Sequence, residues 1–498
     1  MGRSFFYRYA CSLLAYNSHA GRRIACGIMT GSLLMGLYGC SAAENTVAVD
    51  TQQQETTQES LEPVTFTFYS ADGLEDTWTD PVAQMITEKT GVTLKMDYPA
   101  DSNDNRIELM VATGEYPDFV FAKGSVSTLI RNDALIDMSD LIDEYGPNIK
   151  KLYGDEYENL RYSSEDPSIY QLCSDKVQEE TLETSGTAQL QWAVLQENQY
   201  RVPYTLEEYT QMIRDYMEKY PMINGKPVIG ISIVCSDWHW YIMLSNPSGY
   251  MNGSADNGQW IVDDEKQEVY YKHAADGQKE YYKQQNLAVG WGIGITKSCK
   301  DPVRAVRFLD WLCSDEAQIL LNWGIEGVDY YYDENGKRCI TEEDLEASRK
   351  DTNYSERTGV GFRVYPYPSY GNQSVDSTGN SYSKSSREMI KEGYDEMEKE
   401  ALKAWNVDML TDIFPQKEEF SKDAYSPLWA LTLPDELEKM LVALDNVSWK
   451  GLIECVVSPA DDFDAKWDEL QQNLKDAGLE KADREMTALL RDEISRRE

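Results

Sequence analysis

Side chains that commonly bind metals are scarce in this chain of 498 residues. His239 and His273 are the only histidines beyond residue 40, and no HExxH motif occurs. A three-histidine zinc site is therefore excluded for that part of the sequence. Asp333-Glu-Asn335-Gly336 has the start of a calcium loop but lacks the later oxygen ligands, so we expect a hairpin turn there and no metal site.

Motifs for a nucleophile or a phosphate loop are also absent from the sequence. There is no G-x-S-x-G turn, Walker loop or G-x-G-x-x-G fingerprint, because the glycines from Gly290 to Gly294 have the wrong spacing. A carboxylate pair for glycoside hydrolysis stays open, since 86 acidic residues make chance pairs inevitable. We expect a protein that is not an enzyme and needs no cofactor.

Aromatic side chains are abundant, and their types suit binding. The chain has 33 Tyr and 12 Trp against 11 Phe. Tyr and Trp combine a flat apolar face with a hydrogen-bonding edge, which suits a surface that is wetter than a core. In Trp238-His239-Trp240, three large rings follow one another in an expected loop, which exceeds what packing needs.

Cys40 is the residue that we expect to be chemically modified. Gly21-Arg22-Arg23 precedes an uncharged apolar run from Ile24 to Leu37, which is too short to span a bilayer. The run ends in Leu37-Tyr-Gly-Cys40, which resembles the lipobox of bacterial lipoproteins. This likeness implies a signal peptide over residues 1–40 and a diacylglyceryl group on Cys40, which would hold the protein on the extracellular face of the cell membrane. The alternative is a plain signal peptide with a chance cysteine.

The segment after Cys40 is polar, and the whole chain is acidic. Residues 41–62 are rich in Gln, Thr, Ser and Glu without an apolar face, so we expect a disordered spacer. The net charge of −39 repels nucleic acid and discourages polyanionic partners. The folded part that remains is long enough for two lobes. The cysteines beyond Cys40 are scattered, which excludes a disulfide framework and leaves a single disulfide open.

Beyond the spacer, strands and helices alternate. Val64–Tyr69 alternates at period 2, and Val92–Met96 and Asp118–Phe121 read as further strands. Short connections between them predict a parallel sheet covered by helices. In such sheets ligands bind beyond the carboxyl ends of the strands, where Tyr69–Asp72 and the region around Lys123 lie.

Helix signals are clear as well. Capping residues followed by proline or acids predict helix starts at Asp80-Pro81, Thr205, Asp301-Pro302 and Ser314, and glycines predict helix ends at Gly91, Gly114 and Gly324. We also expect a buried strand over Val228–Val234. The C-terminal region is expected to be mostly helical, with helices over 384–405, 434–446 and 462–496.

Several segments follow one another in a familiar order. They are the lipobox and spacer, Gly114–Phe121 (GEYPDFVF), Asn132–Pro147, Gly290–Thr296 (GWGIGIT), Lys300–Trp311, Ser314–Gln318 and Asn322–Gly327. In this order they resemble the extracellular solute-binding lipoproteins of ABC transporters, in the branch (family 1) that takes sugars and oligosaccharides. The likeness covers most of residues 60–480. One departure is that Tyr281-Tyr-Lys283 runs almost directly into Gln284-Gln-Asn286, which looks like an internal deletion.

The resemblance implies an α/β, two-lobed fold of the periplasmic-binding-protein type II, with hinge strands and a helical C-terminal region. Ligand would be held in a cleft that closes by hinge motion. We expect a first lobe over 63–175, a second lobe over 176–285, a return to the first lobe over 286–330, and a mostly helical continuation of the second lobe over 331–498.

In such a cleft, aromatic faces would stack on sugar rings while polar side chains bond the hydroxyls. The candidates for ligand contact are Tyr69, Asp72, Trp78, Asp118, Lys123, Trp192, Trp238, His239, Trp240, Trp291 and Tyr365. For five of them a structural role is left open: ordinary surface packing for Tyr69 and Trp78, a turn or cap for Asp118, core packing for Trp192, and hinge packing for Trp291.

The resemblance also implies partners. A monomer would capture a carbohydrate, which we expect to be an oligosaccharide, and deliver it to the permease subunits of an ABC transporter. Two alternatives remain open, a secreted lipoprotein that is a glycoside hydrolase or lyase, and a peptide-binding transport lipoprotein.

Overall fold

A computed structural model of the chain describes residues 62–72, 75–99, 105–163, 166–174, 189–231, 260–263, 265–271, 291–414 and 433–497. Five expectations of the sequence lie outside these ranges: the signal peptide over residues 1–40, lipidation of Cys40, the spacer up to residue 61, the ligand contacts of Trp238, His239 and Trp240, and the shortened segment at 283–286. Within them, no helix is both long enough and apolar enough to cross a membrane.

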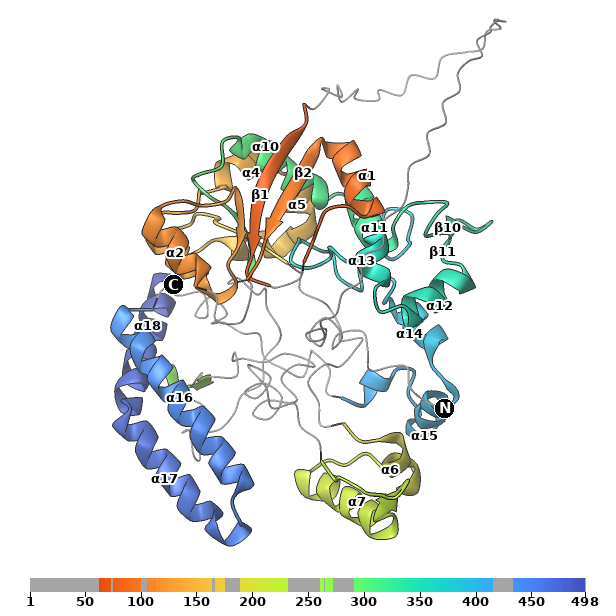
Figure 1. The fold of residues 1–498 in the computed structure, drawn as a ribbon, viewed down its shortest axis with the longest axis vertical. Coiled ribbons are helices and arrows are strands. Elements are labelled where there is room, and N and C mark those ends of the chain that lie inside the picture. The colour runs from red at the N-terminus through yellow and green to blue at the C-terminus, as the bar shows by residue number, and fades with distance from the viewer. Residues whose placement is uncertain are drawn as a thin grey trace, which may run out of the picture. The chain divides into compact units, whose positions relative to one another are not determined.

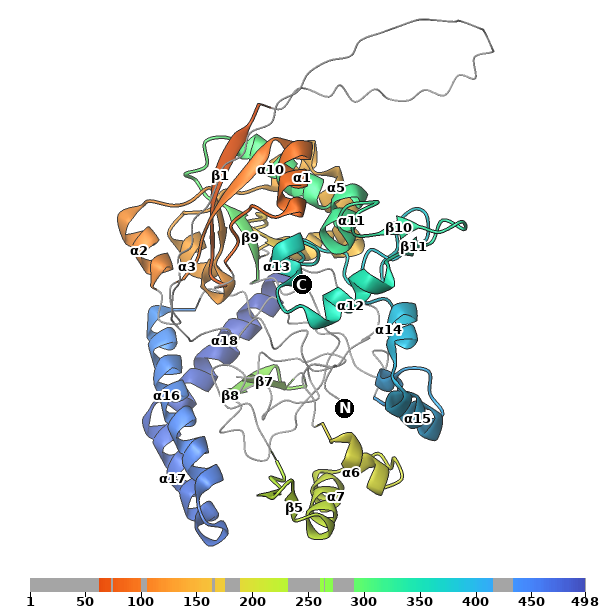
Figure 2. The same cartoon turned by 45° about the vertical axis from the view of Figure 1, so that its right-hand side comes forward.

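A five-stranded sheet forms the centre of the first part of the chain (Figure 1). Its strand order is β2 (Val92–Asp97), β1 (Val64–Ser70), β3 (Phe119–Phe121), β9 (Gly292–Ile295) and β4 (Leu172–Cys173). The pairs β1–β2 and β1–β3 are parallel, which confirms the predicted parallel sheet. β9 is antiparallel to both β3 and β4, so a segment from far along the chain completes this sheet. In Figure 2, β9 is drawn green beside the orange strands.

The local signals in this region are confirmed. The side chain of Asp80 accepts a hydrogen bond from the backbone N–H of Ala83 and caps α1 (Pro81–Thr90). Gly91 ends this helix with φ of 69°, a left-handed conformation in which glycine avoids the strain of a Cβ atom. β2 then begins directly at Val92, as the sequence predicted.

Alternation along β1 gives the sheet two different faces. Phe66 and Phe68 point into the main core with Phe119, whereas Tyr69 packs on the other face with Ile107. The elements around the sheet are α2 (Arg106–Thr113), η2 (Lys123–Ser125), α3 (Val126–Arg131), α4 (Ser139–Tyr145), α5 (Pro147–Tyr153), η3 (Gly154–Leu160), α10 (Pro302–Leu312) and α11 (Asp315–Trp323). The main core includes side chains of α1, α4, α5, α10 and α11, so residues beyond 300 belong to the same core as the first strands.

The close approach of β9 to β4 requires glycine at position 292. A Cβ atom at Gly292 would lie 2.3 Å from the carbonyl oxygen of Leu172 in β4. Only a residue without a side chain lets the two strands approach so closely.

The middle of the chain contains smaller elements. They are α6 (Trp192–Glu197), α7 (Leu206–Lys219), the hairpin β5 (Met222–Ile223) with β6 (Lys226–Pro227), and the hairpin β7 (Trp260–Asp263) with β8 (Glu268–Tyr271). Thr205 caps α7 as predicted. The predicted buried strand at Val228–Val234 is wrong over its described part, because residues 228–231 are not in a strand and Ile229 and Ile231 are exposed. Apolar composition alone had favoured that strand.

The remaining elements are a hairpin and helices. They are β10 (Tyr331–Tyr332), β11 (Arg338–Cys339), α12 (Glu342–Lys350), α13 (Tyr354–Thr358), α14 (Arg387–Gly393), α15 (Glu396–Trp405), η5 (Leu410–Ile413), α16 (Asp435–Val457), η8 (Ala460–Asp462), α17 (Phe463–Asp476) and α18 (Leu479–Arg497). The predicted single helix over 384–405 is two helices, because Asp395 caps α15 in a complete capping box. The predicted helix over 462–496 is also divided, at Ala477 and Gly478.

Candidate ligand-binding site

The carboxyl ends of β1 and β3 bring two predicted site residues together. Ser70 and Phe121 are register partners, and the backbone N–H of Ala71 donates to the carbonyl of Phe121 at 2.8 Å. The segments that follow β1 and β3 therefore leave the sheet side by side. The Nζ of Lys123 then donates to Oδ1 of Asp72 at 2.7 Å. Both side chains are partly exposed, so this ion pair lies at the surface beyond the strand ends.

Trp291 reaches the same edge because β9 runs antiparallel to β3. Phe121 is the register partner of Ile293, so the residue just before β9 lies beyond the carboxyl end of β3. The Nζ of Lys123 lies 4.9 Å from the centroid of the Trp291 ring, within the range of a cation–π contact. Trp291 is 41% exposed, which is unusual for so large an apolar side chain.

Tyr365 joins this group from a distant segment. Its ring centroid lies 5.4 Å from that of Phe121, and the Trp291 centroid lies 6.4 Å from Phe121, both with T-shaped geometry. Phe121 is fully buried, whereas Tyr365 is 39% exposed. We call Phe121, Trp291 and Tyr365, with the Asp72–Lys123 pair, the aromatic platform.

The segment that carries Tyr365 is fastened by Arg363, which is only 2% exposed. Its guanidinium donates to both carboxylate oxygens of Asp76 at 2.7 and 2.6 Å, and to both of Asp80 at 3.0 and 2.5 Å. Burial raises the pKa of Asp80, but hydrogen bonds from Arg363 and Ala83 and the Arg363 charge outweigh it, so the pKa lies below its usual value. Arg363 therefore fixes the Tyr365 segment to the loop after β1.

The platform has the chemistry to hold a hydroxyl-rich ligand. Exposed Trp and Tyr rings can cover the apolar face of a sugar ring, while a carboxylate and an ammonium beside them can bond its hydroxyls. Oδ2 of Asp72 receives no hydrogen bond from any described residue, and the ammonium of Lys123 donates only to Asp72 among them. These groups therefore keep hydrogen-bonding capacity for a ligand.

Two predicted stacking residues do not belong to this site. Trp78 is 7% exposed, its Nε1 donates to Oγ1 of Thr87 at 3.0 Å, and the Arg363 guanidinium lies 4.7 Å from its ring centroid. Tyr69 is 2% exposed and packs on the sheet face described above. A ring covered by protein has no face for a sugar, so both residues are assigned to packing.

Asp118 lies at the wrong end of β3 for this site. Its Oδ2 accepts from the backbone N–H of Thr67 at 2.8 Å and from the Thr67 hydroxyl at 2.7 Å. Because Asp118 precedes β3, it is at the amino end of the strand whereas Lys123 is beyond the carboxyl end. These hydrogen bonds join β1 and β3 and agree with the structural role that the sequence left open for Asp118.

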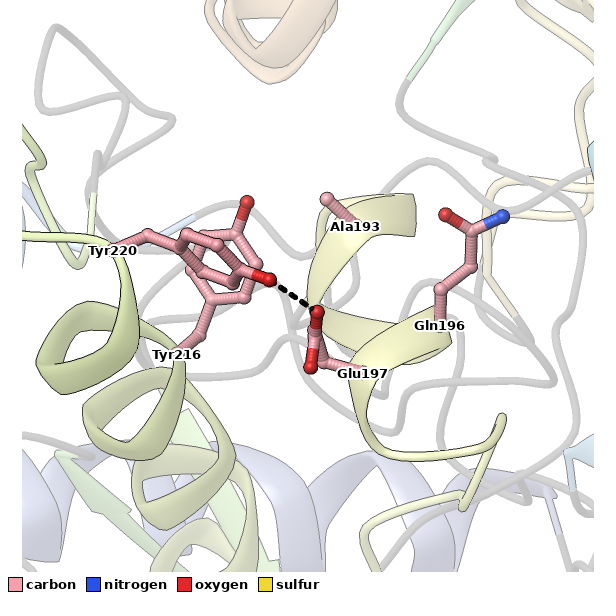
Figure 3. Close-up of a pocket in the computed structure, with 5 residues that line it drawn as sticks. All are labelled: Ala193, Gln196, Glu197, Tyr216 and Tyr220. Atoms are coloured by element: carbon pink, nitrogen blue, oxygen red, sulfur yellow. Dashed lines mark hydrogen bonds between the residues drawn. The ribbon is translucent and has the colours of Figure 1, made fainter. Parts of the chain in front are cut away.

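Trp192 is half-buried beside a separate hollow. It packs in a small cluster with Met212 and Trp405, as its alternative interpretation anticipated. A hollow of about 280 Å³ between α6 and α7 is lined by Ala193, Gln196, Glu197, Tyr216 and Tyr220 (Figure 3). The Tyr220 hydroxyl donates to Glu197 at 2.6 Å, and Lys219 also donates to Glu197, which lowers the pKa of that carboxyl. This carboxylate is thus already occupied by protein donors.

No metal site competes with this interpretation in the described part of the chain, where no cluster of three or more His, Cys, Asp or Glu could hold a metal ion. The predicted hairpin at 333–336 is confirmed, because Oδ1 of Asp333 accepts from the backbone N–H groups of Asn335 and Lys337 at 2.8 Å each. It links β10 to β11.

Two residues of the site were missed from the sequence. Phe121 was predicted to lie in a strand, but no sequence signal indicated that its ring contacts the exposed rings of Trp291 and Tyr365. Arg363 was not singled out, although an arginine among the aromatic and apolar residues of Val360–Tyr367 was a possible signal for a buried ion pair.

The fold is that of the two-lobed solute-binding proteins of ABC transporters. No protein-family model and no curated protein matches the sequence, but solved structures do. An extracellular solute-binding protein from Bifidobacterium longum subsp. infantis matches with a TM-score of 0.59 at 12% identity, over 88% of this chain and 99% of that one. An HMO-binding, ABC-transporter-associated solute-binding protein from Bifidobacterium longum infantis matches with a TM-score of 0.58 at 12% identity, over 86% and 98%.

The alginate-binding protein AlgQ2, in a structure without calcium ion, is a third match. Its TM-score is 0.54 at 16% identity, over 86% of this chain and 98% of that one. At such low identities these matches establish the fold, and the residues of the aromatic platform have to carry the functional argument.

Proposed function

We propose that this chain is a membrane-anchored extracellular binding protein that captures a carbohydrate, an oligosaccharide in our proposal, and delivers it to an ABC permease. The observation that carries the proposal is the aromatic platform, where two exposed rings share one buried ring beside a carboxylate and an ammonium. Its place beyond the carboxyl ends of parallel strands is where ligands bind in open α/β sheets.

The mechanism is capture by closure. A sugar that stacks on Trp291 and Tyr365 would be enclosed when the second lobe closes over the first, as in other hinged binding proteins. Closure removes water from the bonded hydroxyls and strengthens those hydrogen bonds. No bond of the sugar is broken, so the ligand is released intact to the permease.

The solved neighbours support this proposal by what they bind. Two of the neighbours described above are named as an HMO-binding and an alginate-binding protein, and the third as an extracellular solute-binding protein. We extend carbohydrate capture to this chain because its platform offers the residue types that sugars require.

Thermal unfolding of a protein that begins at Ser41, measured with a panel of neutral oligosaccharides, tests the proposal. A ligand at 100 times its Kd stabilises the folded state by about 2.7 kcal/mol, which would raise the melting temperature by several degrees. Trp291→Ala and Tyr365→Ala are expected to weaken binding about tenfold or more, because each loses a stacking contact. Tyr331→Ala is the matched control, since Tyr331 is 45% exposed and has no place in the platform.

The outcomes separate the alternatives. Shifts with peptides and none with sugars would favour a peptide-binding protein, and cleaved sugar recovered by chromatography would favour a hydrolase or lyase. For the anchor, lipid labelling in cells of the wild type and Cys40→Ala is decisive. Label that persists in Cys40→Ala would contradict the proposed anchor.

A further inference from the structure

The charged pair at the platform has a consequence for the kind of sugar that binds. Lys123 is the cation beside the exposed Trp291 ring, at 4.9 Å from the ring centroid. A free ammonium in this place would attract a carboxylate-bearing sugar. Here, however, Oδ1 of Asp72 accepts its hydrogen bond at 2.7 Å, so the cation already has an anionic partner from the protein.

An acidic ligand would meet Asp72 at the same place. To reach Lys123, a ligand carboxylate has to share one ammonium with the Asp72 carboxylate, and two like charges a few ångströms apart repel each other. The alternative is to displace Asp72, which loses the existing ion pair. A neutral hydroxyl meets neither cost, because it can donate to Oδ2 of Asp72 and accept from Lys123.

Two arginines in described segments near the platform already have protein partners. Arg363 is bound to Asp76 and Asp80, and Arg106 is paired with Asp97. The chain as a whole carries a net charge of −39, which adds a repulsive field for an anion approaching from solution.

We propose that the aromatic platform selects uncharged sugars and rejects sugars that carry carboxylates, because Asp72 holds the ammonium of Lys123. This inference rests on the proposed carbohydrate-binding function and names the class of sugar. The backbone of Lys123 supports a fixed position for the pair, since its φ of 49° is rare for a residue with a side chain.

The experiment compares a sugar with its own acidic derivative. The neutral oligosaccharide that gives the largest melting shift is oxidised at its primary hydroxyls to carboxylates, and the Kd of both forms is measured by calorimetry at low and physiological salt. We expect the acidic form to bind weaker by on the order of tenfold, with a larger difference at low salt.

Asp72→Asn is the informative variant, because it keeps the shape and removes the charge. It is expected to strengthen binding of the acidic form at least severalfold relative to the neutral form. Its melting temperature without ligand checks that it folds. Asp118→Asn, on the same sheet but at the other strand end, is the matched control and is expected to leave the ratio of the two Kd values unchanged.

Three results would overturn the inference. An acidic form that binds as tightly as the neutral one, or an unchanged ratio in Asp72→Asn, contradicts selection by Asp72 while carbohydrate capture stands. Binding of no sugar in either form contradicts the proposed function itself, and the inference falls with it.

Discussion

Arg363→Met is the substitution whose effect the structure defines most sharply. The guanidinium makes four hydrogen bonds of 2.5 to 3.0 Å to Asp76 and Asp80, and all three side chains are almost fully buried. Methionine keeps much of the volume but leaves two buried carboxylates next to each other without a counter-charge. Removing one partner of a buried ion pair costs about 3–5 kcal/mol, so we expect a loss of that size in the free energy of unfolding at pH 7.

The loss in the free energy of unfolding caused by Arg363→Met should become smaller as the pH falls. In the wild type the pKa of Asp80 is held below its usual value, so its stabilising contribution is present above about pH 4 and is lost as the pH falls through the lowered pKa. In Arg363→Met, burial and the neighbouring Asp76 carboxylate are expected to raise the pKa of Asp80, and its protonation on acidification would relieve the repulsion. The difference between variant and wild type should therefore shrink between pH 7 and pH 4.

Urea unfolding followed by circular dichroism at both pH values measures this difference. Arg357→Met is the control, because the Arg357–Asp351 pair, at 3.0 Å, is exposed and its loss should cost less than about 1 kcal/mol. A cost for Arg363→Met as small as that of the control, or a cost that stays the same at pH 4, would refute the reasoning.

Two further predictions concern stability. Burial raises the pKa of Asp483 to about 6, so its stabilising contribution is full below about pH 4 and is lost as the pH rises through 6. The side-chain oxygen of Asp483→Asn can still accept from the Tyr271 N–H. This variant should melt at a higher temperature than the wild type at pH 8 and lose the advantage at pH 4. Equal effects at both pH values would contradict the raised pKa of Asp483. Gly292→Ala places a Cβ atom 2.3 Å from the Leu172 carbonyl oxygen. It should lower the urea concentration at the unfolding midpoint and speed amide hydrogen exchange in β4 and β9. An unchanged midpoint would show that the two strands can move apart without a loss of stability.

Elements that depend on local chemistry were predictable from the sequence. The cap at Asp80, the helix end at Gly91 and the alternation that makes β1 each depend on residues within a few positions. The strand predicted from Val228 failed because apolar composition does not distinguish a buried strand from an exposed connection.

The site itself was only partly predictable. Asp72, Lys123, Trp291 and Tyr365 were chosen as separate candidates, and the structure brings them together. Their meeting depends on strand register and on the return of β9, which no local pattern encodes. Trp78 was chosen on the same grounds, but burial beside Arg363 excludes it, because residue type alone does not tell which face of a ring the protein covers.

The return of β9 also orders events during synthesis of the chain. Among the described strands, β4 pairs only with β9, so a ribosome that has released residues up to 174 has supplied an edge strand whose partner in the sheet is not yet made. The core of this half further includes Val360, Tyr370 and Tyr382. The amino-terminal half therefore cannot complete its folding until more than two hundred residues beyond β4 have been made.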